Sequence, residues 1–119
     1  MRLVVDTNIL ISALLSGTSL PARLIVCWRD GRFDLLTAAE QLDELMRVTR
    51  YPKIRERLIP ALAGRLVNDL RAIAVTVEEL PVVDVSTDPH DNHLLGIAVY
   101  ESTKIVTVRN VLTMHGWLP

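Results

Sequence analysis

RLVVDTN, residues 2–8, is the stretch from which the fold of this chain can be predicted. Leu3, Val4 and Val5 lead directly into Asp6, which predicts a buried strand with a carboxylate at its C-terminal end. Ligands of open α/β sheets bind beyond the carboxyl ends of the strands, so Asp6 lies where a functional site is expected. Alternatively, Asp6 only caps the helix expected from Ile9. The stretch by itself favours neither interpretation.

The rest of the chain alternates predicted helices with predicted strands. Helices are expected over residues 9–15, 19–29, 38–49, 53–58 and 60–72. Another helix should open at Asp88 and place Ala98 and Val99 on its buried face. Strands are expected over residues 33–37, 74–77 and 104–107, and residues 110–119 are expected to be irregular. This alternation predicts an α/β protein with a mainly parallel sheet and helices on both faces.

Composition narrows the class of protein. The 119 residues suit a single domain, residues 1–119, and half of them are hydrophobic with few aromatics, so the core should be aliphatic. The single Cys27 rules out an intramolecular disulfide, fits a reducing compartment and is expected in the core. A signal peptide needs a continuous apolar region, whereas Asp6 and Asn8 interrupt the apolar run at this N-terminus. We therefore expect a soluble cytoplasmic protein with no membrane partner.

Charge is unevenly distributed although the formal net charge is only −1. Seven basic and two acidic residues lie between Arg47 and Arg71, and five acids without Lys or Arg lie between Glu78 and Asp91. An acidic focus beside a basic flank suits a metal site that acts on a phosphate backbone. Charged surface helices also produce such clusters. The candidate RNA contacts in the basic flank are Arg47, Arg50, Lys53 and Arg55.

Three acids are the candidate catalytic and metal-binding residues: Asp6, Glu44 and Asp91. Each follows or precedes a predicted strand on one side, so all three should meet at the same sheet edge. Clustered carboxylates repel one another and normally persist around cations. Oxygen-only ligands suit Mg²⁺ or Mn²⁺, which can activate water and stabilise charge on a phosphodiester.

Each acid also has a purely structural explanation. Glu44 could be a solvated helix residue close to Arg47, although Glu40 and Glu44 form an unfavourable like-charge i, i+4 pair. Asp88 is a good N-cap with Pro89 at the first helical position. Asp91 would then be favoured by the helix dipole.

Four motifs in order carry a family resemblance over nearly the whole chain. VVDTNILISAL (4–14) resembles the opening of PIN-domain proteins, and LDEL (42–45), followed by YPK (51–53), resembles their second acidic motif. DPHDNHLL (88–95) resembles the third motif, and IVT (105–107) resembles the strand before the fourth. The most similar subgroup is the toxin component of toxin–antitoxin pairs, the VapC-like ribonucleases.

The resemblance implies a three-layer fold with four or five parallel strands and a nuclease for single-stranded RNA that needs Mg²⁺ or Mn²⁺. It also implies inhibition by a cognate antitoxin, and a homodimer is a candidate assembly. Asp6, Glu44 and Asp91 take the places of the metal-binding acids, and Asn8 takes that of a polar residue supporting the first acid. Asp88 and Thr107 are further supporting candidates within the third and fourth motifs.

The C-terminal end, residues 108–119, departs from the family pattern. Val108 and Arg109 stand where the family has a Gly and a fourth acid. Arg109 could pair with Asp6 or Asp91 and compete with the metal, or it could contact phosphate. Two functions therefore remain open: an active ribonuclease with three acids, or a PIN-fold module that binds RNA or an antitoxin without efficient cleavage. An unrelated α/β protein with a single strand-end Asp ranks third, because Asn8 replaces the second acid of dehalogenase-type phosphatases.

Overall fold

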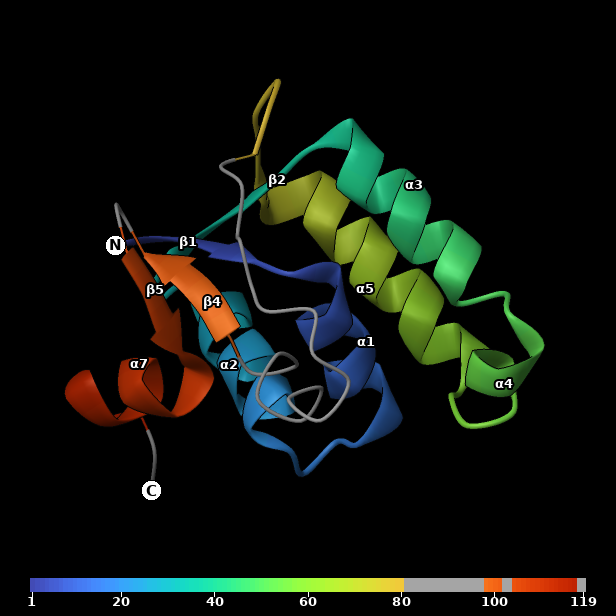
Figure 1. Cartoon of the computed structure of the whole chain (residues 1–119), viewed down its shortest axis with the longest axis horizontal. Helices are drawn as coiled ribbons and strands as arrows, with labels where there is room; N and C mark the ends of the chain where they lie inside the picture. Colours follow the sequence, from blue (N-terminus) through green and yellow to red (C-terminus); the bar gives the residue numbers. More distant parts are fainter. Residues whose placement is uncertain (81–97, 102–103, 118–119) are drawn as a thin grey trace.

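The computed structural model describes residues 1–80, 98–101 and 104–117. Helices and strands alternate through the first part of the chain, and a strand pair and a helix follow at its end (Figure 1). The order is β1 (Arg2–Val5), α1 (Thr7–Leu15), α2 (Leu20–Arg29), β2 (Asp34–Thr37), α3 (Ala39–Val48), α4 (Pro52–Arg55), α5 (Pro60–Ile73), β3 (Val75–Thr76), β4 (Ala98–Glu101), β5 (Lys104–Thr107) and α7 (Val108–Met114).

The sheet has five strands in the order β3-β2-β1-β4-β5. β1 pairs in parallel with β2, and β2 pairs in parallel with β3. β4 is antiparallel to both of its neighbours, β1 and β5, so the other four strands all point the same way. The α/β fold with a mainly parallel five-stranded sheet, expected from the sequence, is thereby confirmed.

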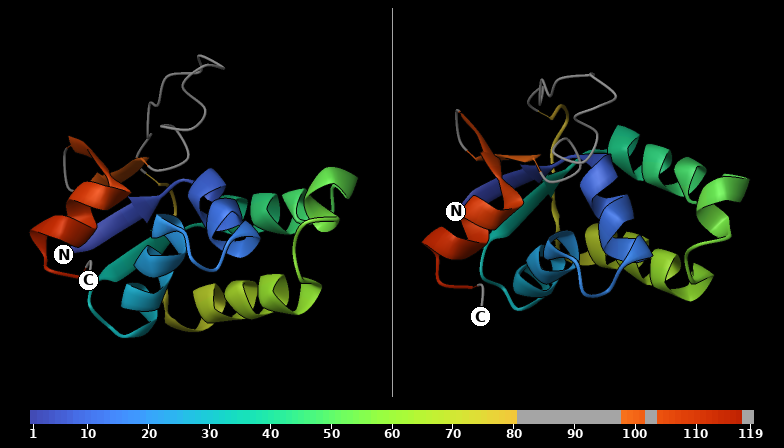
Figure 2. Two further views of the ribbon diagram at one scale, coloured as in Figure 1. Left: turned by 90° about the horizontal axis from the view of Figure 1, so that it is seen from below. Right: turned by 60° about the horizontal axis from the view of Figure 1, so that its bottom comes forward.

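The central strand β1 is the most deeply buried part of the sheet. Leu3, Val4 and Val5 are all buried, as the apolar run predicts. The surrounding core is aliphatic and includes Leu10, Leu35 and other side chains from α1, α2, α3, α5 and α7. Figures 1 and 2 show α7 beside the β4–β5 end of the molecule and the packed pair α3–α5 at the opposite end, with α1 and α2 between them.

Local signals set the helix boundaries. The Ser19 hydroxyl accepts a hydrogen bond from the Ala22 amide at 3.2 Å and caps α2, with Pro21 in the first turn as predicted. Gly31 follows α2 with a φ of 79°, a left-handed conformation that glycine adopts without strain.

Cys27 is 2% exposed, and burial raises the pKa of its thiol above the ordinary value, so it is a core residue as expected.

Among the described residues no single helix is long and apolar enough to cross a membrane, and α1 with α2 meets this test only as a pair bent by 101°.

Residues 98–101 correct one expectation. Ala98 and Val99 were expected on a helix, but they begin strand β4. Val99 is fully buried and lies in register between Val5 of β1 and Val106 of β5. Val99 and Tyr100 have high strand propensity, and a short apolar run cannot by itself distinguish a buried strand from a buried helix. The start of the expected helix, at Asp88, lies outside the described residues.

The C-terminal segment corrects a second expectation, because residues 108–114 form the helix α7 instead of an irregular tail. The Thr107 hydroxyl accepts a hydrogen bond from the Asn110 amide at 3.0 Å and caps the helix. Val108, Val111 and Leu112 are all fully buried, at the i, i+3, i+4 spacing of a helix face. Gly116 and Pro119 led to the expectation of an irregular tail, but they lie beyond the end of α7 at Met114.

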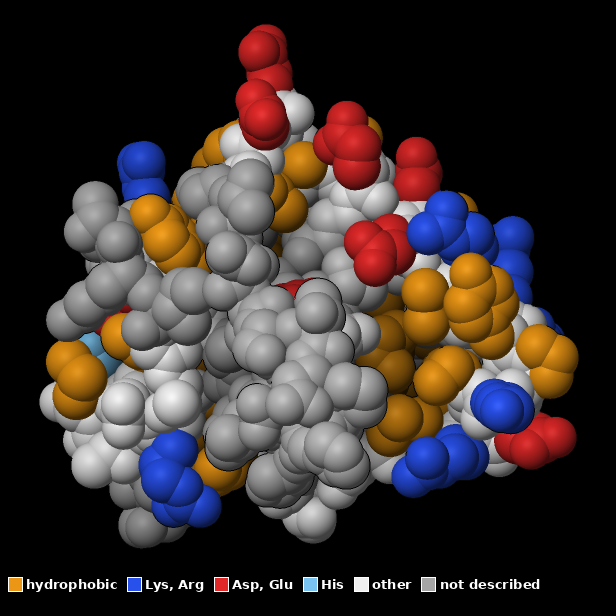
Figure 3. All heavy atoms as spheres, viewed as in Figure 1, with side chains coloured by type: hydrophobic (Ala, Val, Ile, Leu, Met, Phe, Trp, Pro, Cys, Tyr) orange, Lys and Arg blue, Asp and Glu red, His pale blue; other side chains and the backbone are white. Residues whose placement is uncertain are grey.

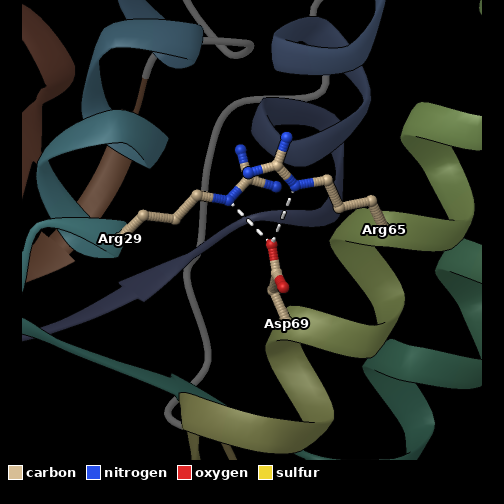
Figure 4. A network of polar contacts seen from close by, with 3 residues as sticks. All are labelled: Arg29, Arg65 and Asp69. Carbon is tan, nitrogen blue, oxygen red and sulfur yellow. Dashed lines mark hydrogen bonds and ion pairs between the residues drawn. The ribbon is translucent and has the colours of Figure 1, made fainter.

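Polar contacts join α2 to α5. Arg29 Nε lies 2.8 Å from Asp69 Oδ2, while Arg65 Nε, one helical turn before Asp69, lies 3.8 Å from the same oxygen (Figure 4). The Arg29 and Asp69 side chains are 29% and 30% exposed, whereas Arg65 is 66% exposed. The short, partly buried contact with Arg29 should therefore stabilise the fold more than the long, exposed contact with Arg65.

Replacing Asp69 with Ala should lower the free energy of unfolding by about 0.5–1 kcal/mol, because solvent screens a partly exposed ion pair. Urea unfolding of the single and double variants with Arg29→Ala measures the coupling between the two side chains. Arg65→Ala is the matched control and should change stability by less than about 0.5 kcal/mol. A coupling to Arg65 as large as that to Arg29 would contradict this ranking.

Candidate functional site

Asp6 lies at the C-terminal end of the central strand, where the sequence predicted it. It is the N-cap of α1, and its Oδ1 accepts a hydrogen bond from the backbone N–H of Asn8 at 3.1 Å. The capping interpretation is therefore correct for one carboxylate oxygen. Among the described residues, Oδ1 is the Asp6 oxygen that accepts a side-chain hydrogen bond.

Glu44 shares a pocket with Asp6. The pocket has a volume of about 260 Å³ and lies at the carboxyl end of β1, beside the start of α3. Its lining residues are Val4, Val5, Asp6, Thr7, Glu40, Gln41, Glu44 and Leu80. Two acids predicted from separate motifs are thus brought together, and Glu40 joins them. The other two predicted acids of this site, Asp88 and Asp91, lie outside the described residues.

Gln41 is a residue that the sequence interpretation missed. Its side-chain amide donates a hydrogen bond to the Val5 carbonyl at 2.6 Å and accepts one from the Thr37 hydroxyl at 2.8 Å. Gln41 is 6% exposed and Thr37 is 0% exposed. These bonds join β1, the end of β2 and the first turn of α3 just beside Asp6. The available signal was a Gln four residues before Leu45, on the buried stripe of an amphipathic helix, where a polar group requires a partner.

The pocket is electrostatically one-sided. Asp6, Glu40 and Glu44 line it, and none of its described lining residues is Lys or Arg. None of these three acids forms an ion pair with another described residue. Within the described ranges, no group of three or more His, Cys, Asp or Glu side chains is close enough to hold a metal ion. The described part of the site still provides carboxylate oxygens from two segments, and carboxylate oxygen is the donor type that Mg²⁺ and Mn²⁺ prefer.

The supporting candidates differ from their expected roles. The backbone N–H of Asn8, rather than its exposed side chain, donates the hydrogen bond to Asp6. Thr107 uses its hydroxyl to cap α7. Arg109 is exposed in the first turn of α7, at the same sheet end as Asp6. β4 separates their two strands, a spacing of about 10 Å, and no ion pair joins Arg109 to Asp6.

The basic candidates lie at and beyond the C-terminal end of α3, with Arg47 in its last turn. Arg47, Arg50, Lys53 and Arg55 are all exposed, and Arg50 and Arg55 line a groove of about 330 Å³ between α3, α4 and α5. Figure 3 shows acidic side chains at the upper edge of the molecule and basic side chains at the α4 end. The uneven charge of the sequence is thus also a separation of charge in space.

Two substitutions in α3 separate a structural role from an electrostatic one. Gln41→Leu should lower the free energy of unfolding by about 1–3 kcal/mol, because the buried Thr37 hydroxyl and the Val5 carbonyl lose their partner. Glu44→Gln, one turn later, should leave stability in chelator unchanged or slightly raised, because it removes one of several like charges. Chemical unfolding measures both changes. A marked loss for Glu44→Gln would show that Glu44 has a structural partner.

Comparison with known proteins supports the resemblance of the four motifs. The sequence model of the PIN domain matches residues 2–112. No curated protein and no solved structure matches the chain significantly. The matched region covers nearly all of the sequence, including β1, the pocket and α7 up to Leu112. The chain therefore belongs to the PIN-domain family, whose members are generally metal-dependent nucleases.

Proposed function

We propose that this protein is an Mg²⁺- or Mn²⁺-dependent endoribonuclease for single-stranded RNA, acting as the toxin of a toxin–antitoxin pair. The observation that carries the proposal is the shared pocket of Asp6 and Glu44, which come from separate elements and face no lining cation. Like-charged carboxylates held together in this way favour a bound cation. Cytoplasmic location and a cognate antitoxin are parts of the same proposal.

Asp6, Glu44 and Asp91 would hold the metal ion. When bound, the ion activates a water molecule and stabilises charge on the phosphodiester. The chain's own contribution is to position the donors: the Asn8 amide fixes one oxygen of Asp6, and Gln41 fixes the start of α3 against Val5. The acids alone would repel an RNA phosphate, and a bound metal ion would offset this repulsion.

The basic side chains beyond α3 supply the attraction for RNA in this proposal. Arg47, Arg50, Lys53 and Arg55 are exposed, and the ion pairs within the described residues involve other arginines. Such contacts with phosphate are independent of sequence and weaken as salt is raised. Asp6 and Glu44 would therefore determine the chemistry, whereas the basic flank would determine affinity.

Asp6→Asn and Glu44→Gln should each reduce cleavage of an unstructured RNA by more than about 100-fold, because each removes a metal ligand. The assay is RNA cleavage with Mn²⁺ or with chelator, alongside calorimetric Mn²⁺ titration. Asp43→Asn is the matched control: it removes the same charge next to Glu44, but Asp43 does not line the pocket. Expression of the parent protein, and not of Glu44→Gln, should arrest growth. Cleavage that persists in chelator would overturn the proposal.

Arg109 is the one observation that favours a second function, a PIN-fold module that binds RNA or an antitoxin without efficient cleavage. It places a cation at the sheet end of Asp6 where the family has an acid.

Because β4 separates Arg109 from Asp6, Arg109→Asp should tighten Mn²⁺ binding by no more than about threefold, through the screened field alone. Calorimetric Mn²⁺ titration of the parent and the variant measures this change. A parent without activity, made active by Arg109→Asp, would establish the binding module and reject the nuclease.

A further inference from the structure

The groove between α3, α4 and α5 carries an inference beyond the pocket of acids. Three arginines line it, and each comes from a different part of the chain: Arg50 follows α3, Arg55 lies in α4, and Arg71 lies in the last turn of α5. Arg71 is distant in sequence from the basic candidates between Arg47 and Arg55, and only the packing of α5 against α3 brings it to this groove.

None of the described residues that line this groove is acidic. The other lining residues are Met46, Thr49, Leu58, Pro60, Ala63, Gly64, Val67 and Asn68. The two acids of the basic segment lie elsewhere: Glu56 is not among the lining residues, and Asp69 pairs with Arg29 and Arg65. In the part of the chain that the structure describes, the three guanidinium groups therefore keep their full charge for a ligand.

The floor of the groove is apolar and its rim is charged. Leu58, Ala63 and Val67 are buried at its base. Arg71 Nη2 lies 3.3 Å from the sulfur of Met46, a neutral and weak acceptor that holds the guanidinium over the groove without neutralising it. Most of the five donors of Arg71 remain available, and guanidinium groups bind phosphate in a bidentate manner.

The position of the groove relative to Glu44 sets the path that a strand would take. Glu40 and Glu44 lie on one side of α3, and Met46 and Thr49, which line the groove, lie on the opposite side. An RNA strand bound at the acidic pocket would therefore have to pass around the C-terminal end of α3 to reach the arginines. Since the pocket repels phosphate and the net charge is only −1, a strand needs an attractive site close by.

We infer that this groove, with Arg50, Arg55 and Arg71, is an RNA subsite that binds the phosphates of a single strand away from the acidic pocket, around the C-terminal end of α3. The apolar floor would lie beneath the adjoining sugar or base. The inference rests on the proposed function. An acidic protein segment is the competing occupant. The three guanidinium groups favour RNA, because each can bind a phosphate in a bidentate manner and each comes from a separate segment around one groove.

The test is binding of a labelled, unstructured single-stranded RNA to the full chain in chelator, followed by fluorescence anisotropy over a range of salt. Cleavage does not occur without metal, so the result is independent of catalysis, and the cleavage assay reports separately on the proposed function. Arg50→Ala and Arg71→Ala should each weaken binding roughly threefold to tenfold and lower the slope of log affinity against log salt by about 0.7.

Two further variants make the test specific to the groove. Arg57→Ala removes the same charge from the same segment, but Arg57 does not line the groove, so RNA affinity should change by less than about twofold. Asn68→Glu adds a carboxylate to the lining and should weaken binding as much as the loss of an arginine does. The substituted side chains are exposed, so the midpoint temperature of thermal unfolding of each variant should stay within about a few degrees of the parent value, as is usual for surface substitutions.

Two results would overturn the inference. If Arg57→Ala weakens binding as much as Arg71→Ala, the attraction is a diffuse field without a subsite. If the arginine variants leave RNA binding unchanged but abolish binding of an acidic amphipathic peptide, the groove is a protein-docking site.

Discussion

The hydrogen bond from the Gln41 side chain to the Val5 carbonyl is the contact on which the geometry of the acidic pocket depends. It spans 2.6 Å and joins the helix that carries Glu44 to the last residue of the strand before Asp6. The Thr37 hydroxyl, at the end of β2, donates a second hydrogen bond to the same Gln41 side chain. A buried amide has a fixed set of donors and acceptors, so it specifies one placement of α3 where apolar contacts alone would allow several.

This placement explains how the pocket can hold like charges. Asp6 is stabilised from within its own helix by the Asn8 amide, and Glu40 and Glu44 are held by the backbone of α3. Within the described residues, none of these acids forms an ion pair with Arg or Lys. A cation from solution would not have to displace such a described partner.

Charge in this molecule follows the direction of α3. Asp6 and Glu40 lie at its N-terminal end by the sheet edge, Glu44 lies one turn further along, and the arginines gather beyond its C-terminal end. A net charge of −1 conceals this separation, because the two regions nearly cancel.

The sequence by itself determined the parts of this protein that local physics controls. The apolar run before Asp6 predicted the central strand, the Ser19 cap with Pro21 predicted the start of α2, and the helical period predicted α3 and α5. It also placed Asp6 and Glu44 at the same sheet edge, where both line one pocket.

Only the tertiary structure decided the features that depend on long-range pairing. Residues 98–101 form a strand because Val99 fits between Val5 and Val106, an environment that no local window contains. β4 thereby separates Arg109 from Asp6, although the order of motifs had suggested that they were neighbours. The partners of Gln41 and the convergence of Arg71 with Arg50 likewise depend on packing between distant segments. Periodicity identifies which face of an element is buried, but the partner on that face is set by the whole fold.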